Sequence, residues 1–104
     1  MSAIIGTPGS DNLYGSESDD FIQGGAGNDT ISAKEGDDLV QGLSGFDLIN
    51  AGKGNDTIYG GTQNDTVFGE KGEDLMYGTG NDDLLVGSSG KDTLLGGYGK
   101  DTLD

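Results

Sequence analysis

Residues 24–32 read Gly-Gly-Ala-Gly-Asn-Asp-Thr-Ile-Ser, and residues 51–59 read Ala-Gly-Lys-Gly-Asn-Asp-Thr-Ile-Tyr. Both stretches are copies of one nonapeptide, with aspartate at position six and an aliphatic residue at position eight. The pattern recurs eleven times between residues 6 and 104 without a break in register. Its aspartates are Asp11, Asp20, Asp29, Asp38, Asp47, Asp56, Asp65, Asp74, Asp83, Asp92 and Asp101. A fixed short period indicates one supersecondary unit copied in tandem.

The nonapeptide divides into a turn and a short strand. Its first six positions are rich in Gly, Asn and Asp, which tolerate the positive φ that tight turns require. Its last three positions place an aliphatic residue between residues that favour strands, as in Thr30-Ile31-Ser32. Because alternate side chains of a strand point to opposite faces, each repeat directs one aliphatic side chain inward. No ten-residue window is free of glycine, which argues against any helix.

The charge and the missing residue types restrict the ligand. The chain has 19 acidic residues, 5 lysines and a net charge of −14, a balance that repels nucleic acids and anionic lipids. It has no Cys and no His, so disulfides and zinc sites are excluded and hard, oxygen-binding cations remain. The apolar content is thin, and ordering the 22 glycines is entropically costly. We therefore expect folding to need a cation that binds only the folded form.

The repeat resembles the Gly-Gly-x-Gly-x-Asp-x-aliphatic-x nonapeptide of the RTX (repeats-in-toxin) family, the haemolysin-type calcium-binding repeat. The resemblance covers residues 6–104, and residues 1–5 fit a partial preceding repeat that has a strand but no turn of its own. Glycine holds position one except at Ala33 and Ala51, and position four except at Ser18, Gln63 and Asn81. Since glycine there is expected to have positive φ, we expect strained or rearranged turns at Ser18 and Gln63 and a milder effect at Asn81.

The resemblance implies an all-β fold, a right-handed parallel β-roll (a β-solenoid) with two nonapeptides per turn. Odd-numbered repeats would form one parallel sheet. Even-numbered repeats, together with residues 3–5, would form the other, with about six short strands in each. The position-eight residues would pack between the two sheets as a narrow core: Leu13, Ile22, Ile31, Val40, Ile49, Ile58, Val67, Met76, Leu85, Leu94 and Leu103.

The resemblance also implies several Ca²⁺ ions, each held between two loops one turn apart. The aspartates would line two edges, one from Asp11 to Asp101 and the other from Asp20 to Asp92. The gaps between the stacked loops would hold at most about nine ions. Backbone carbonyls would complete the sites, and those implied belong to Gly9, Gly24, Gly25, Ala26, Gly27, Gly36, Gly42, Ser44, Gly45, Gly52, Gly54, Gly60, Thr62, Gly69, Gly72, Gly78, Gly80, Gly87, Gly90 and Gly96. Calcium accepts six to eight oxygen ligands, carbonyls among them, whereas magnesium demands tighter geometry and keeps its water.

The function expected from these features is a calcium-binding module that is disordered without calcium and folds when calcium bridges its loops. In the RTX family such modules belong to proteins exported from Gram-negative bacteria by type I secretion, so a secreted, extracellular protein is implied. We see no signal peptide, no membrane span and no family-type secretion signal or cap after the last repeat. An excised module, an engineered array or a self-contained variant is therefore expected.

The alternative function is a structural or self-assembling scaffold. Apolar residues at positions seven and nine of the even repeats would face outward and offer an interface, and uncapped ends would allow stacking of chains. These residues are Phe21, Leu39, Tyr59, Leu75, Tyr77 and Leu95. Catalysis is not expected, because no His or Cys is present and no Ser lies in a nucleophile context. Ice binding is disfavoured, because position three carries no ladder of Thr or Asn.

Overall fold

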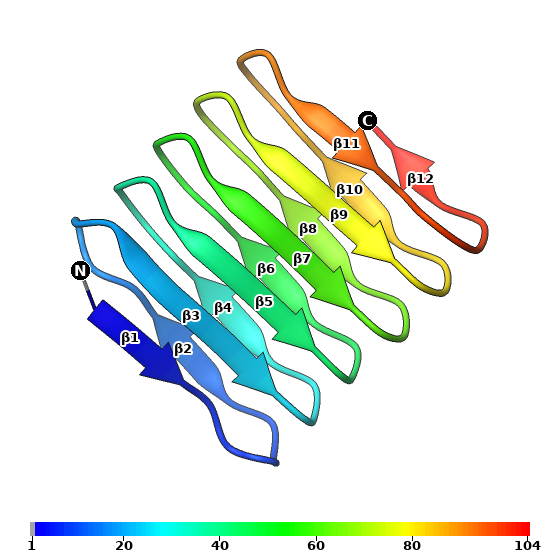
Figure 1. Cartoon of the computed structure of the whole chain (residues 1–104), viewed down its shortest axis with the longest axis horizontal. Coiled ribbons are helices and arrows are strands. Elements are labelled where there is room, and N and C mark those ends of the chain that lie inside the picture. The colour runs from blue at the N-terminus through cyan, green and yellow to red at the C-terminus, as the bar shows by residue number, and fades with distance from the viewer. Residues whose placement is uncertain (1) are drawn as a thin grey trace.

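The computed structural model describes residues 2–104, which contain strands and turns but no helix (Figure 1). Met1, part of the expected partial repeat, lies outside the described residues. Two parallel six-stranded sheets face each other, and the chain passes from one to the other after every strand. In the described part of the chain, no helix is long and apolar enough to cross a membrane. The predicted parallel β-roll with two nonapeptides per turn is confirmed.

One sheet contains the even repeats and the partial repeat before them. Its strand order is β1-β3-β5-β7-β9-β11. The strands are β1 (Ser2–Ile5), β3 (Asp20–Gly25), β5 (Leu39–Leu43), β7 (Thr57–Gly61), β9 (Leu75–Thr79) and β11 (Thr93–Leu95). Partners are 18 residues apart, so Ile22 pairs with Val40 and Ile58 with Met76. One turn of the roll is therefore two nonapeptides.

The other sheet contains the odd repeats. Its strand order is β2-β4-β6-β8-β10-β12. The strands are β2 (Asn12–Tyr14), β4 (Thr30–Ser32), β6 (Leu48–Asn50), β8 (Thr66–Phe68), β10 (Leu84–Val86) and β12 (Thr102–Leu103). Most of these strands have three residues, whereas β3, β5, β7 and β9 have five or six because pairing continues into position two of the next loop.

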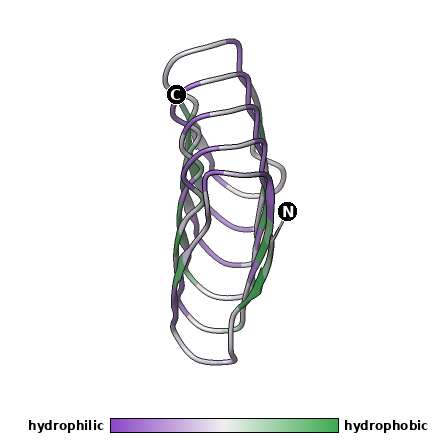
Figure 2. Cartoon of the chain, turned by 90° about the vertical axis from the view of Figure 1, so that its left-hand side faces the viewer, coloured by the Kyte–Doolittle hydropathy of each residue, from purple (hydrophilic) through white to green (hydrophobic). Residues whose placement is uncertain are grey.

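The core is a single apolar layer between the sheets. The molecule measures 33 × 33 × 13 Å, and Figure 2 shows it edge-on, with the hydrophobic residues lying along its two layers. Eight position-eight side chains are completely or almost completely buried: Ile22, Ile31, Val40, Ile49, Ile58, Val67, Met76 and Leu85. Ala33 and Ala51, at position one, join this core, which the repeat pattern did not predict.

The expectation that all eleven position-eight residues are core is wrong at one end of the roll. Leu103 on β12 is 48% exposed, and Leu13 and Leu94 are only partly buried. These side chains lie on strands at or near the ends of the two sheets, where less of the stack covers them. The apolar layer is therefore complete only in the middle turns.

The turns differ from the expectation at Ser18. Gln63 and Asn81 have left-handed backbone, with φ of 70° and 72°, as predicted for position four. Ser18 does not, because the loop that contains it has a different, internally hydrogen-bonded turn. Position two also has positive φ from the third repeat onward, which composition did not indicate, since that position often carries large side chains: Lys34, Leu43, Glu70, Thr79 and Ser88.

Candidate metal sites

The position-six aspartates form two rows, one along each edge of the roll, because 18 residues complete one turn. In each row the backbone N–H of one aspartate donates to Oδ1 of the aspartate one turn later. The Asp29 N–H lies 2.9 Å from Asp47 Oδ1, and the Asp38 N–H lies 2.8 Å from Asp56 Oδ1. Successive members of both rows are joined in this way. The two rows expected from the spacing are therefore present.

The second carboxylate oxygen of the inner aspartates is buried and has no hydrogen-bond donor within residues 2–104. This holds for Oδ2 of Asp29, Asp38, Asp47, Asp56, Asp65, Asp74 and Asp83. These residues are only 1–3% exposed. Burying a charged oxygen without a partner is costly, and a buried charge in a folded protein is normally paired or bound to a metal. Seven such oxygens are therefore acceptors available to cations.

Each of these oxygens lies beside position one of its own loop, which is glycine in most repeats. A Cβ added at Gly24 would lie 2.7 Å from Asp29 Oδ2 and 2.9 Å from the Gly42 carbonyl oxygen. At Gly42 the corresponding distances are 2.6 Å to Asp47 Oδ2 and 2.5 Å to the Gly60 carbonyl oxygen. A carboxylate of one loop and a carbonyl of the loop one turn later therefore converge where the side chain is missing.

The oxygens near this space come from carboxylates and backbone carbonyls. Among the described residues, no three His, Cys, Asp or Glu side chains form a cluster that could hold a metal, so an ion between the loops would need carbonyl ligands. Position-one carbonyls such as that of Gly42 face this space, whereas the Gly25 carbonyl, at position two, accepts the Ser44 N–H at 3.2 Å. A carbonyl has two lone pairs, so this bond leaves one for a ligand. An all-oxygen donor set fits calcium.

The family comparison agrees with this geometry. A family model described as the RTX calcium-binding nonapeptide repeat (4 copies) matches residues 5–40, 41–76 and 77–104. The chain belongs to the RTX calcium-binding nonapeptide repeat family. Searches of curated proteins and of solved structures found no match.

Burial makes the aspartate rows of this RTX chain electrostatically unfavourable. It raises the pKa of Asp29, and it raises the pKa of Asp38, Asp47, Asp74 and Asp83 to about 6. The pKa reaches about 8 at Asp56 and Asp65, in the middle turns. Desolvation is the largest cause, neighbouring aspartates add repulsion, and the N–H bond to Oδ1 opposes both. Either protons or cations must therefore compensate these carboxylates.

A second ladder at position five was not anticipated. The Asn28 side-chain oxygen accepts the Phe46 N–H at 2.8 Å, and the Asn55 side-chain oxygen accepts the Glu73 N–H at 2.9 Å. The signal in the sequence was a run of short polar residues at this position, namely Ser10, Asp19, Asn28, Asp37, Asn55, Asn64 and Asp82. These side chains fasten one loop to the next on the solvent side of the aspartate rows.

Proposed function

We propose that this RTX chain binds calcium between loops stacked one turn apart, and that calcium binding drives its folding. The observation that carries the proposal is the set of seven buried Oδ2 atoms without donors. A divalent cation supplies the charge that the protein itself does not provide there. Since nearly every strong contact along the edges joins two successive turns, an ion bound between them favours the coiled state over the extended chain.

The ion between residues 24–29 and residues 42–47 illustrates the proposed ligands. Asp29 and Asp47 would supply carboxylates, and the carbonyls of Gly25, Gly27 and Gly42 would contribute together with that of Ser44. Asp47 also offers Oδ2 to the next gap, so each inner aspartate would serve two ions. Removal of one aspartate should therefore disturb more than one site.

The coupling to folding follows from charge and core size. A net charge of −14 on a slab 13 Å thick opposes compaction, and the apolar layer has only one side chain per repeat. A site that exists only in the coil converts binding free energy into folding free energy. An RTX chain with this property would stay disordered in a low-calcium cytosol and fold after secretion.

Far-UV circular dichroism tests this proposal. With millimolar calcium we expect a β-sheet spectrum and a cooperative thermal transition, and with excess chelator the spectrum of a disordered chain. Magnesium at the same concentration is the control, and it should not restore the sheet, because it binds carbonyl-rich sites poorly. A sheet spectrum that persists in excess chelator would contradict the coupling.

The location of the sites is tested by Asp56→Asn beside Asp37→Asn. Both changes remove one negative charge and keep an oxygen that can accept an N–H. Asp56 is buried with an unpartnered Oδ2, whereas Asp37 is exposed and its Oδ1 accepts the Asn55 N–H at 2.8 Å. Calorimetric titration should show one or two fewer ions for Asp56→Asn and the parent number for Asp37→Asn. Equal losses would mean that overall charge, and not the buried rows, governs binding.

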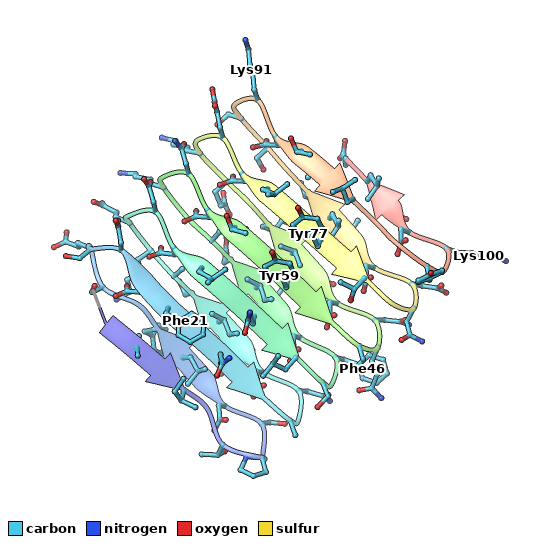
Figure 3. All side chains as sticks on the ribbon, in the orientation of Figure 1. Phe21, Phe46, Tyr59, Tyr77, Lys91 and Lys100 are labelled. Carbon is cyan, nitrogen blue, oxygen red and sulfur yellow. The ribbon has the colours of Figure 1, made fainter. Side chains whose placement is uncertain are left out.

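A scaffold function is the second candidate, favoured by the outward face of the β1–β11 sheet. Figure 3 shows Phe21, Tyr59 and Tyr77 on this sheet, and the rings of Tyr59 and Tyr77 stack with centroids 4.8 Å apart. Tyr59 is 36% exposed and Leu95 is 47% exposed. Sedimentation in calcium separates the candidates, since a scaffold predicts concentration-dependent oligomers and a calcium module alone predicts a monomer.

A further inference from the structure

The first two loops satisfy their aspartates differently from all later loops. In residues 6–11, the Thr7 N–H donates to Asp11 Oδ2 at 2.6 Å and the Thr7 hydroxyl donates to Asp11 Oδ1 at 2.8 Å. In residues 15–20, the Ser16 N–H donates to Asp20 Oδ2 at 2.6 Å and the Ser16 hydroxyl to Asp20 Oδ1 at 3.0 Å. Both oxygens of these two carboxylates therefore have a donor from their own loop.

The backbone of these loops differs in the same way. Positions two and four have positive φ in every repeat from the third onward, but Thr7, Gly9, Ser16 and Ser18 do not. The side-chain type at position two does not explain the difference. Thr79 occupies the same position as Thr7, yet its φ is 74° and its hydroxyl donates to the Gly61 carbonyl at 2.5 Å.

Proline makes the first loop unsuited to the later conformation. Pro8, the single proline of the chain, follows Thr7 and restricts it to extended backbone. Pro8 also lacks the N–H that position three uses elsewhere, as when the Lys53 N–H donates to the Lys34 carbonyl at 2.9 Å. A calcium ligand set like that of the inner loops would require Thr7 to turn against Pro8 and to give up its bonds to Asp11.

We propose that hydroxyl and amide donors, and not calcium, hold the first two gaps, between residues 6–11 and 24–29 and between residues 15–20 and 33–38. Calcium occupies the seven gaps that follow, which are those with an unpartnered Oδ2. Seven divalent ions carry a charge of +14, which equals the magnitude of the net charge of −14. The first turn is then a cap that does not depend on calcium. This inference rests on the proposed function and specifies which of its sites fill.

Counting bound ions tests the inference. Calorimetry and equilibrium dialysis of the whole chain with calcium should give seven ions per chain. The variant Thr7→Gly/Pro8→Ala/Ser16→Gly removes both hydroxyls and the proline restriction, and it should bind up to nine. The matched control is Thr79→Gly/Ser88→Gly, which changes the same two residue types at the same loop position and should bind seven.

The outcomes separate the two proposals. A parent chain that binds nine ions overturns the inference and leaves calcium binding intact, and so does a triple variant that folds but still binds seven. A parent chain that binds no calcium overturns the proposed function, and the inference with it. If the triple variant does not fold, the ion count of the parent chain and of the Thr79→Gly/Ser88→Gly control decides the question.

Discussion

At the scale of the residue, each inner aspartate uses its two oxygens for different purposes. Oδ1 accepts the N–H of the aspartate one turn earlier and so holds the stack, while Oδ2 remains open beside position one. Asparagine would keep the first role and lose the charge required for the second. This division explains why the row consists of aspartate in every repeat, whereas position five accepts Ser, Asn, Asp and even Phe46.

Position-one glycine is predicted to be required for the space it leaves. In Gly24→Ala the new Cβ would lie 2.7 Å from Asp29 Oδ2 and 2.9 Å from the Gly42 carbonyl, so we expect a loss of about 1–3 kcal/mol in unfolding free energy and weaker calcium binding. Urea denaturation in saturating calcium measures the loss.

The matched control for this prediction is Gly80→Ala. Gly80 is at position three, and nothing lies within 4 Å of its added Cβ. Neither Gly24 nor Gly80 has positive φ, so backbone strain is the same in both variants. A loss as large at Gly80 as at Gly24 would show that glycine matters here through chain flexibility instead of space.

At the scale of the element, the strands are held by their neighbours and by one inward side chain each. A three-residue strand such as β8 has no stability by itself, and its place is set by parallel pairing with β6 and β10 and by burial of Val67. The contribution of a position-eight residue should therefore depend on how many turns cover it.

This dependence predicts different costs for the same kind of truncation. Ile58→Ala, in the middle of the roll and 0% exposed, should lower the unfolding free energy by about 2–5 kcal/mol. Leu103→Ala, at the same repeat position but 48% exposed, should cost less than about 1 kcal/mol. Denaturation of both variants in calcium measures the two costs, and similar values would contradict an apolar layer that is complete only in the middle.

The repeat period was sufficient to predict which strand pairs with which, because an 18-residue turn follows once two nonapeptides close one coil. It also predicted the aspartate rows. It did not predict left-handed backbone at Leu43, with φ of 74°, a conformation that costs a residue of this type about 1–3 kcal/mol in isolation. Stacking imposes it, since the Leu43 carbonyl then accepts the Thr62 N–H at 2.9 Å. Such conformations depend on the neighbouring turn and not on the local residue.

At the scale of the whole molecule, the raised pKa values predict how the calcium-free chain responds to pH. The folded chain has aspartates with pKa of about 6 to 8, compared with 3.8 when they are exposed, so it binds more protons than the unfolded chain across that interval. Its stability is therefore highest at low pH and is lost as pH rises through 6 to 8. In chelator, the sheet signal should be stronger at pH 5 than at pH 8.

Calcium should remove this dependence, because it replaces the protons. Binding at pH 7 should release protons, chiefly from Asp56 and Asp65, whose pKa is about 8. Calorimetry in two buffers with different ionisation enthalpies measures the release. A calcium-free chain with more sheet at pH 8 than at pH 5 would contradict the assigned direction.

The unequal strand lengths of the two sheets determine how the chain can grow or shrink. Strands β5, β7 and β9 have five residues, whereas β6, β8 and β10 have three. Loss of a single nonapeptide would place every later strand in the opposite sheet, so long strands would adjoin short ones and stacked pairs such as Tyr59 and Tyr77 would separate. Loss or duplication of 18 residues would leave all alignments intact. The heritable unit of this protein is thus twice the repeat visible in its sequence.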